Sequence, residues 1–185
     1  MVIYLDDITV FSKTDKEHCF HLKRVFLKCR RYGLSLNPKK SLFVVQEGNL
    51  LGHIVSAEGV RIDPSRVEAI QTLSLPRSKK EVHAFLGKIN FLRRFISNFA
   101  ELVKHITTML RKGNEVKWTS EPREYFVQIK KALTEAPVLI SPDYSKDFLI
   151  FSFASCDTIA AVLLQKNDQG QEQPIAFFSK ALRDA

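Results

Sequence analysis

The fold of the amino-terminal part is decided by one stretch, Val2-Ile3-Tyr4-Leu5-Asp6-Asp7-Ile8-Thr9-Val10-Phe11. Its β-prone runs flank Leu5-Asp6-Asp7, which predicts a short hairpin with two aspartates at its tip. Adjacent side chains of a regular strand point to opposite faces, so only a turn lets both carboxylates serve one site. Such a pair suits a hard divalent cation such as Mg2+. Asp is also a favoured turn residue, so ordinary turn chemistry remains the alternative.

The composition is that of an ordinary globular protein. The chain has 185 residues, of which 45% are hydrophobic and 26% charged, and this balance argues against extended disorder. No apolar run approaches the roughly 20 residues of a membrane span, and the acidic amino terminus is unlike a signal peptide. Cys19, Cys29 and Cys156 lack the close spacing of a zinc or redox motif. We expect an intracellular protein, cytoplasmic or nuclear, without a membrane partner.

Positive charge is concentrated in the first three quarters of the chain. Residues 1–136 carry a net charge of +10 and residues 137–185 a net charge of −2, which suggests two modules. Residues 12–40 and residues 76–112 each contain nine basic and two acidic side chains. Such stretches favour a polyanionic partner, and the alternative is a pair of solvated helix faces.

Capping signals and apolar spacing predict four helices. Their caps are Thr14, Asp63, Ser78 and Ser120, and their expected ends lie before Gly33, before Pro76, at Ile96 and before Pro137. The third is predicted as one long helix with a buried stripe, formed by Val82, Phe85, Leu86, Ile89, Leu92, Phe95 and Ile96.

Strand-like runs occupy most of the remainder. Ser41–Val45 and Leu50–Val55 predict a second hairpin across residues 46–49, and the hairpin cores are expected to pack under the helix at residues 15–31. Three later runs predict an antiparallel meander, at residues 148–153, 159–165 and 174–178. Residues 139–146 are the best candidate for a linker. The fold class is α+β.

Several segments together resemble one known family. Tyr4-Leu5-Asp6-Asp7 resembles the Y-x-D-D box of reverse transcriptases, and residues 33–40 and 51–56 resemble the end of the palm and the primer-grip hairpin. Residues 85–96 resemble the thumb of gypsy-type long-terminal-repeat retrotransposon polyproteins, and Trp118-Thr119 with residues 132–139 resembles the following connection. Because these motifs occur in the family's order, the chain is identified as a member of this reverse transcriptase family.

The resemblance implies a division of the chain into four parts. Residues 1–62 would be the carboxy-terminal part of the palm, with two antiparallel hairpins and a helix, and residues 63–117 the helical thumb. Residues 118–146 would be the connection. Residues 147–185 would be a truncated ribonuclease H-like domain that begins with an antiparallel sheet.

The resemblance also assigns roles around the polymerase site. Asp6 and Asp7 would bind Mg2+ or Mn2+ for nucleotidyl transfer onto a primer 3' end, a reaction that two such ions catalyse. Tyr4 and Leu5 would lie under the primer terminus. A lysine, Lys40 in preference to Lys39, would donate a proton to the pyrophosphate leaving group, and the alternative is an ordinary solvated loop lysine.

Nucleic-acid contacts are implied for two further regions. Leu51, Gly52 and His53 would hold the primer backbone, although His53 could equally be a strand residue that faces water. Basic thumb residues would contact the backbone of an RNA/DNA template-primer duplex, namely Lys79, Lys80, Lys88, Arg93 and Arg94. The phenylalanines at positions 85, 91 and 95 are expected in the core rather than stacked on bases.

Departures from the family limit what we expect of the isolated chain. It starts almost at the Y-x-D-D box, so the fingers and the earlier palm aspartate are missing; we therefore expect a fragment or a decayed gene copy without polymerase activity. Metal and dNTP would bind only in a complete polymerase. In the nuclease-like part, Phe153 stands where active members have an aspartate, and Asp157 is interpreted as a turn residue, which predicts an inactive fold.

The alternative function is that of a non-catalytic nucleic-acid-binding remnant of a decayed retroelement. An uninterrupted upstream reading frame would favour the enzyme segment, which in an active element would be located in a virus-like particle. Stop codons there would favour the remnant.

Overall fold

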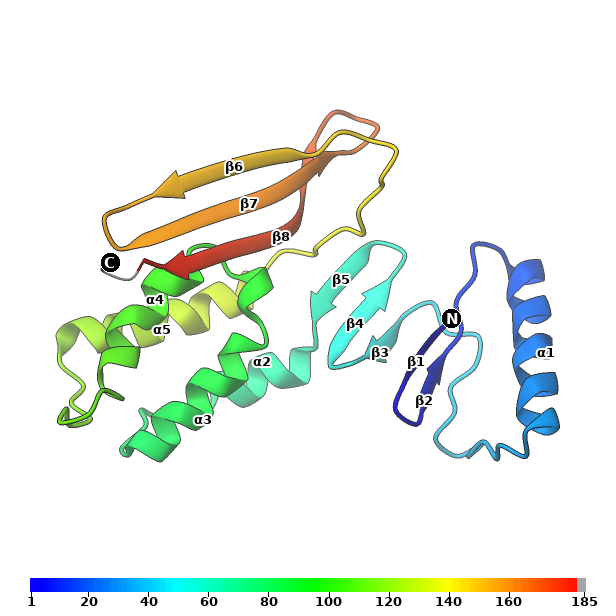
Figure 1. Ribbon diagram of the computed structural model, residues 1–185, viewed down its shortest axis with the longest axis horizontal. Helices are drawn as coiled ribbons and strands as arrows, with labels where there is room; N and C mark the ends of the chain where they lie inside the picture. The colour runs from blue at the N-terminus through cyan, green and yellow to red at the C-terminus, as the bar shows by residue number, and fades with distance from the viewer. Residues whose placement is uncertain (183–185) are drawn as a thin grey trace. The chain divides into compact units, whose positions relative to one another are not determined.

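The computed structural model describes residues 1–182 and has a mixed α+β architecture, as predicted (Figure 1). Its elements are β1 (Val2–Tyr4), β2 (Asp7–Thr9), α1 (Asp15–Arg31), β3 (Gly48–Leu50), β4 (His53–Ser56), β5 (Gly59–Ile62), α2 (Pro64–Gln71), α3 (Lys79–Asn90), the 3-10 helix η1 (Arg93–Phe95), α4 (Phe99–Thr108), α5 (Ser120–Thr134), β6 (Leu149–Ala154), β7 (Thr158–Lys166) and β8 (Glu172–Ala181). Within residues 1–182, none of these helices has the length and apolar character needed to cross a membrane.

The chain forms two compact units, which divide between Gln46 and Glu47, and each is described by itself. The first contains β1, β2 and α1, and the second contains the remaining elements. The predicted primer-grip residues are thus grouped with the helical part. The functional division into palm, thumb, connection and ribonuclease H-like part stays a prediction.

In the first unit, the predicted hairpin and helix are both confirmed. Strands β1 and β2 pair antiparallel across a two-residue turn, Leu5-Asp6, with Tyr4 opposite Asp7. Helix α1 begins after Thr14, whose hydroxyl accepts a hydrogen bond from the Glu17 amide at 3.3 Å. It ends near Gly33, whose φ of +66° only glycine adopts without strain.

The expected packing of the hairpin cores beneath α1 is wrong for most of these side chains, although Cys29 of α1 is buried and Phe26 contacts Phe43. The side chains of β1 are exposed, and so are Phe20 and Leu27 of α1. Ser41–Val45, predicted as a strand, has no strand structure, and Leu42 to Val45 are exposed as well. Strands of three residues offer too little apolar surface to hold a helix against them in this unit.

The second sheet differs from the predicted second hairpin. Its order is β3-β4-β5, all antiparallel, and the first turn lies at Leu51-Gly52 rather than at residues 46–49. Leu51 and Gly52 both have positive φ, 53° and 80°, as a type I′ hairpin turn requires. The tight turn therefore pairs residues 48–50 with the following strand, so that residues 41–45 remain outside the sheet.

The predicted long third helix is interrupted. Helix α3 ends at Asn90, the tighter η1 follows, and Asn98 at φ 51° precedes α4, which the sequence analysis did not predict. The apolar stripe is nevertheless buried, as expected, at Val82, Phe85, Ile89, Leu92, Phe95 and Ile96. The 3-10 turn lets the chain change direction while the apolar stripe stays against the core. Apolar spacing alone does not predict such a break, because the same side chains are buried with or without it.

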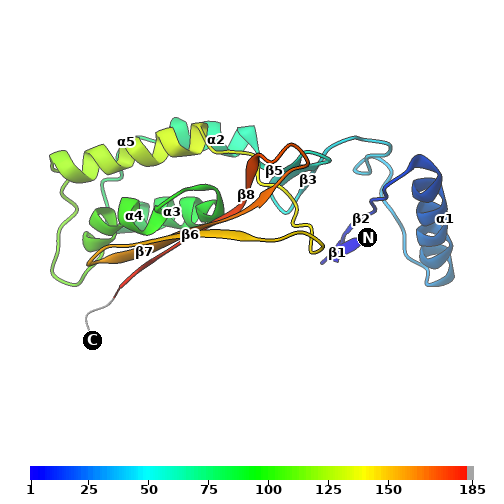
Figure 2. The same ribbon diagram turned by 90° about the horizontal axis from the view of Figure 1, so that it is seen from above.

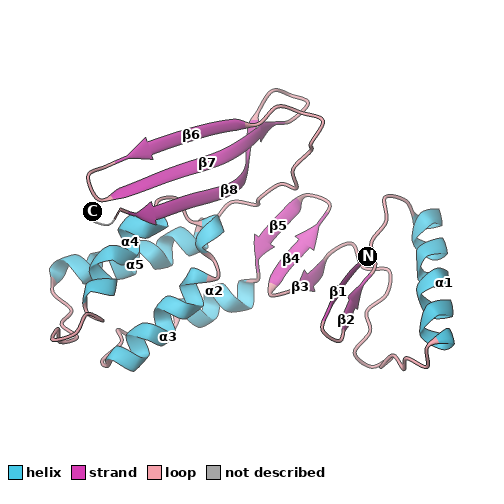
Figure 3. Cartoon of the chain, viewed as in Figure 1, coloured by secondary structure: helices cyan, strands magenta, loops and turns pink. Residues whose placement is uncertain are grey.

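Three layers build most of the second unit, and Figure 2 shows them edge-on. The predicted meander is confirmed as the sheet β6-β7-β8, with a bulge at Leu163/Leu164 (Figure 3). Helices α3 and α4 form the middle layer, and α2 and α5 the outer one. The Ala100 amide donates to Ser179 Oγ at 2.8 Å between α4 and β8. Between α2 and α5, Lys130 Nζ donates to two carbonyls, those of Gln71 at 2.8 Å and Leu73 at 2.6 Å.

Two smaller expectations need correction. Helix α5 is capped at Thr119, without a side-chain hydrogen bond, and Ser120 is its first residue. The proposed linker at residues 139–146 begins in the core, because Leu139 is fully buried. Leu139 also forms a β-bridge with Val60, through hydrogen bonds of 2.7 and 2.9 Å.

Candidate functional site

The two aspartates lie at the tip of the β1–β2 hairpin, as predicted. Asp6 is in the turn, Asp7 is the first residue of β2, and both are exposed. Leu5, 84% exposed, has φ 52°, an uncommon conformation for a leucine. Backbone strain of this kind clusters at functional sites, which motivates a functional interpretation of the turn.

The donor set of this hairpin fits part of a magnesium site. Mg2+ keeps several waters and is commonly bound through one or two carboxylates together with substrate phosphates. Within residues 1–182, neither Asp6 nor Asp7 has an ion-pair partner, so both carboxylates are available as ligands. The same residues contain no group of three or more His, Cys, Asp or Glu side chains that could hold a metal ion. The hairpin by itself offers two candidate ligands, and the metal-binding role of Asp6 and Asp7 stays a prediction.

The candidate proton donor lies in a turn organised by Asn37. The Lys39 amide donates to Asn37 Oδ1 at 3.0 Å, the Lys40 amide to the Asn37 carbonyl at 3.1 Å, and Ser41 Oγ to the same carbonyl at 2.8 Å. Both lysines are exposed. In the part of the chain that the structure describes, no ion pair joins either lysine to Asp6 or Asp7. The catalytic role of Lys40 stays a prediction.

His53, the last of the three predicted primer-grip residues, is half-buried against the end of α3. Its ring stacks on Phe91, with the centroids 4.6 Å apart, and on Phe95 at 5.4 Å. Burial, followed by the nearby charges of Arg94 and Arg66, holds the pKa of His53 below its ordinary value, although the Leu51 backbone acts in the opposite direction. Its Nε2 is buried without a hydrogen-bond partner. The neutral imidazole is therefore a stacking surface at the base of the Leu51-Gly52 turn.

The predicted basic thumb residues present an exposed surface. Lys80, Lys88, Arg93 and Arg94 are exposed, whereas Lys79 is half-buried and donates to the Arg111 carbonyl at 2.9 Å. Among residues 1–182, none of these five side chains forms an ion pair. Their charge is thus available to a polyanion.

A stripe along α3 joins these cations to an aromatic side chain. Lys80, Ala84, Lys88 and Phe91 follow one another at spacings of four, four and three residues, so they share one helix face. Phe91 is 41% exposed, in contrast to the buried Phe85 and Phe95, so the expected core position is wrong for this phenylalanine. The face ends beside His53.

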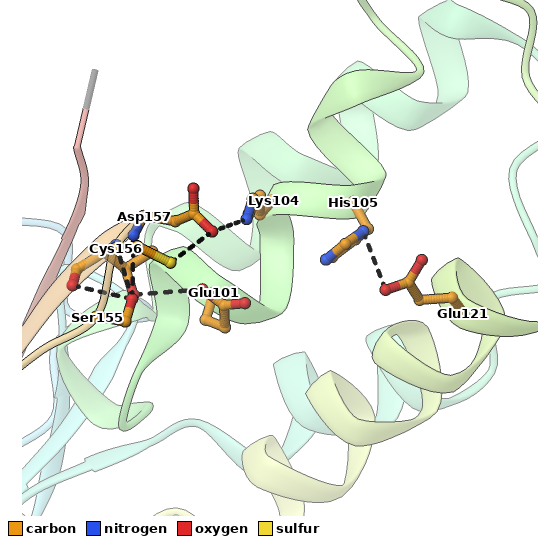
Figure 4. A network of polar contacts seen from close by, with 8 residues as sticks. Glu101, Lys104, His105, Glu121, Ser155, Cys156 and Asp157 are labelled. Atoms are coloured by element: carbon orange, nitrogen blue, oxygen red, sulfur yellow. Dashed lines mark hydrogen bonds and ion pairs between the residues drawn. The ribbon is translucent and has the colours of Figure 1, made fainter. Parts of the chain in front are cut away.

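The region in which active members of the family would carry the nuclease aspartate holds a network of polar contacts (Figure 4). Phe153 is 63% exposed on β6. Asp157 lies in the connection between β6 and β7, as expected for a turn residue, and its Oδ2 is 2.7 Å from Lys104 Nζ of α4. The hydrogen bond and charge of Lys104 lower the pKa of Asp157. Nearby, the Thr158 hydroxyl donates to Glu101 Oε2 at 3.3 Å.

Sequence reasoning missed two residues of these surroundings. Lys104 lies in α4, which was not predicted, and Arg66 lies against the Leu51-Gly52 turn although it belongs to α2. The apolar periodicity of residues 99–106 could have indicated α4. No local signal marks Arg66, because its contact depends on how α2 meets the sheet.

Comparisons with known families match both ends of the chain. The family described as "Reverse transcriptase (RNA-dependent DNA polymerase)" matches residues 1–55. The family described as "RNase H-like domain found in reverse transcriptase" matches residues 118–185. These two regions contain the aspartate hairpin and the β6-β7-β8 sheet, respectively.

Curated relatives match almost the whole chain. The retrovirus-related Pol polyprotein from transposon 412 of Drosophila melanogaster is 36% identical over 97% of this chain. The transposon Tf2-3 polyprotein of Schizosaccharomyces pombe is 31% identical over 100% of it. In both comparisons the chain spans 14% of the relative's length.

Solved structures share both sequence and fold with the chain. A foamy viral protease-reverse transcriptase in complex with double-stranded DNA matches 99% of this chain and 32% of its own, with a TM-score of 0.85 and 31% identity. The same type of enzyme in complex with an RNA/DNA hybrid matches 99% of this chain and 25% of its own, with a TM-score of 0.84 and 31% identity. The chain is therefore a segment of a retroelement reverse transcriptase, with reverse transcriptase and RNase H-like domains of the kind found in retrotransposon polyproteins.

Proposed function

We propose that this chain acts within a gypsy-type long-terminal-repeat reverse transcriptase, in which Asp6 and Asp7 bind Mg2+ or Mn2+ at the site of nucleotidyl transfer from dNTP to a primer 3' end. The observation that carries the proposal is the strained, exposed turn that presents both carboxylates. When bound, the metal activates the attacking hydroxyl and neutralises charge on the leaving pyrophosphate. The activity belongs to a longer protein, of which this chain supplies ligands and nucleic-acid contacts.

The remaining residues of the first unit have supporting roles in this proposal. Tyr4 and Leu5, both exposed beside the aspartates, support the primer terminus. Lys40 donates a proton to the leaving pyrophosphate, because nearby phosphate charge keeps its ammonium protonated. The matches to relatives whose names describe Pol polyproteins support this assignment of the reaction.

In the second unit, the proposed partner is an RNA/DNA template-primer duplex, bound by the Lys80–Lys88 face of α3 together with Arg93 and Arg94. These cations contact phosphates and position the duplex without reading its sequence. The complexes of similar reverse transcriptases with double-stranded DNA and with an RNA/DNA hybrid support this choice of partner. Leu51, Gly52 and His53 hold the primer strand at the end of the same face.

Duplex binding is tested by fluorescence anisotropy of a labelled RNA/DNA hybrid with the purified chain, between 50 and 200 mM salt. Neutralising about four to six phosphates should give a log-log slope of affinity against salt near −4 to −5. Lys80→Gln combined with Lys88→Gln should make this slope less negative by about 2.

The control is Lys117→Gln combined with Lys131→Gln, which removes the same charge from lysines already paired with Glu115 and Glu135. This variant should retain most of the slope. Absent or salt-insensitive association of the wild-type chain would contradict duplex binding, and equal loss in both double variants would contradict the assignment to α3.

Because the metal is expected to bind only in a complete polymerase, the site is tested there, by titrating Mn2+ into a polymerase in which only this segment is isotopically labelled and recording NMR spectra. Paramagnetic broadening should be confined to the amides around Leu5 to Ile8 and should disappear in the Asp6→Asn, Asp7→Asn double variant. Broadening that persists in this variant, or that is centred elsewhere, would contradict the assignment. That the isolated chain does not extend a primer stays a prediction, which magnesium-dependent extension would overturn.

The non-catalytic remnant is the second candidate function, and the unpaired cations of α3 support it equally well. An intact reading frame for the rest of the polymerase beside the gene favours the enzyme segment, and stop codons there favour the remnant. In either function we place the product in the cytoplasm or nucleus, and in a virus-like particle where the element is active.

A further inference from the structure

Arg66 of α2 lies directly on the Leu51-Gly52 turn. A Cβ atom built on Gly52 would be 2.7 Å from Arg66 Cζ and 2.8 Å from its Nε, closer than any real side chain allows. The guanidinium therefore occupies the space that the missing side chain leaves. Glycine was expected here to let the primer backbone approach, but in this structure the neighbour that approaches is an arginine.

The orientation of this guanidinium is fixed by an aromatic ring. Arg66 Cζ lies 4.8 Å from the centroid of Phe91, within the range of a cation–π contact. Phe91 also stacks on His53, and Arg94 lies 5.8 Å from the centroid of Phe95. Stacked in this way, a guanidinium loses little conformational freedom when its N–H groups bind a ligand.

The charge of Arg66 is only partly compensated: after the hydrogen bonds from Ser65, Arg66 also lowers the pKa of the nearby Asp63 carboxylate. Arg66 is exposed, and within residues 1–182 it forms no ion pair. The nearby carboxylate of Asp63 already accepts hydrogen bonds from the Ser65 amide at 2.9 Å, the Ser65 hydroxyl at 2.8 Å and Asn49 Nδ2 at 2.7 Å. Arg66 lies over Phe91 and Arg94 over Phe95, the two rings that stack on His53; after burial, the charges of both arginines lower the pKa of His53.

We propose that Arg66 is a further nucleic-acid-binding residue, whose guanidinium binds a backbone phosphate of the duplex beside the Leu51-Gly52 turn, next to Arg94. The proposal rests on the duplex binding proposed above and adds a contact from α2, outside the basic face of α3. An exposed guanidinium with a fixed plane suits a phosphodiester, because its N–H groups can bind two oxygens of one phosphate. Gly52 and Phe91 are positioning residues for this contact.

The test is anisotropy of the same RNA/DNA hybrid with an Arg66→Met variant of the full chain. Methionine keeps apolar contact with Phe91 but removes the charge and the donors. Loss of one phosphate contact should reduce the log-log salt slope by about 0.9 and weaken binding about 5- to 10-fold near 0.1 M salt. Arg66→Lys, which keeps a charge but not the planar fork, should retain the slope and lose less affinity.

The control is Arg61→Met. Arg61 lies on the neighbouring strand β5, its Nη2 is 2.8 Å from both carboxylate oxygens of Glu47, and its removal changes the net charge equally. This variant should leave the slope unchanged. Thermal unfolding of each variant distinguishes phosphate binding by Arg66 from a role in packing alone. A packing role would lower the melting temperature without changing the salt slope.

Each outcome has a separate meaning. If the wild-type chain binds the hybrid and Arg66→Met has the slope and affinity of Arg61→Met, the Arg66 assignment is wrong and duplex binding by α3 stands. A lowered melting temperature with an unchanged slope also overturns the assignment. If the wild-type chain does not bind the hybrid, the proposed function and this inference both fail.

Discussion

Substituting alanine at Gly59 should break the β-bridge between Val60 of β5 and Leu139, in the segment that leads to the last sheet. Gly59 has φ 137°, a conformation that is essentially restricted to glycine. A Cβ atom there would lie 3.0 Å from the carbonyl carbon of Leu139 and 3.1 Å from Val138 Cγ1, with the Leu139 oxygen closer still. Because the obstacle is backbone, a rotamer change of a side chain cannot relieve it.

The expected destabilisation combines two effects. Forcing alanine into this conformation costs about 1–3 kcal/mol. Separating Leu139 from Val60 breaks two hydrogen bonds, of 2.7 and 2.9 Å, and each contributes about 0.5–1.5 kcal/mol net. The sum, about 2–6 kcal/mol, is a large part of the roughly 5–15 kcal/mol that stabilises an ordinary domain.

The assay is urea unfolding followed by circular dichroism, together with amide hydrogen exchange at Val60 and Leu139. The Gly59→Ala variant should lose about 2–6 kcal/mol of unfolding free energy, and the two bridge amides should lose protection first. Gly113→Ala is the matched control for positive φ, since Gly113 has φ 86° and no atom within 4 Å of its built Cβ. Gly87→Ala, in the middle of α3 with open space, should stabilise by about 0.5–1 kcal/mol.

A Gly59→Ala variant that unfolds at the same urea concentration as the Gly113→Ala control would refute the expected clash with the Leu139 backbone. Equal destabilisation of the two variants would mean that strain at positive φ is the whole effect and that the Leu139 backbone can move aside. Retained protection at Val60 and Leu139 would have the same meaning.

Two further predictions concern charge. Burial, followed by the charges of Arg94 and Arg66, lowers the pKa of His53 in the folded chain, so on acidification the unfolded chain is protonated at His53 first. The free energy of unfolding should therefore keep the full contribution of neutral His53 above pH about 6.5 and decrease as the pH drops below it. In urea unfolding, the free energy of unfolding of His53→Phe should decrease less between pH 7.5 and pH 5.5 than that of the wild type. An equal decrease in both proteins would contradict this prediction. For the pair Lys104 and Asp157, a double-mutant cycle with Lys104→Met and Asp157→Asn should show a favourable coupling that shrinks in 1 M salt. Since Lys104 lowers the pKa of Asp157, this coupling should also disappear as the pH falls through the range in which Asp157 protonates, and a coupling insensitive to both salt and acid would argue against an ion pair.

Local signals were reliable where the cause of the structure is local. Thr14, Asp63 and Ser78 each accept a hydrogen bond from a nearby amide of the helix that they cap, as the sequence predicted. The Asp6-Asp7 hairpin was predicted for the same reason, since β-prone runs and turn residues act over a few positions.

Errors occurred where several local structures compete. A glycine at position 48 suggested a turn, yet the turn formed at Leu51-Gly52, and Gly48 became a strand residue. The stripe from Val82 to Ile96 suggested one helix, yet the chain tightens after Asn90. In both segments, more than one backbone path buries the same side chains, and packing against the rest of the unit selects between them.

The sequence by itself determined the hairpin that carries the two aspartates and the capped helices, because these depend on neighbours within a few residues. It also determined the buried stripe and the excess of positive charge, which follow directly from the residue types and their spacing. The tertiary structure alone decided that Arg66 lies on Gly52, that Lys104 pairs with Asp157 and that Leu139 is held by Val60. These pairs are separated by 14 to 79 residues along the chain. Their contacts form only when whole helices and sheets pack together, and no local pattern records that geometry.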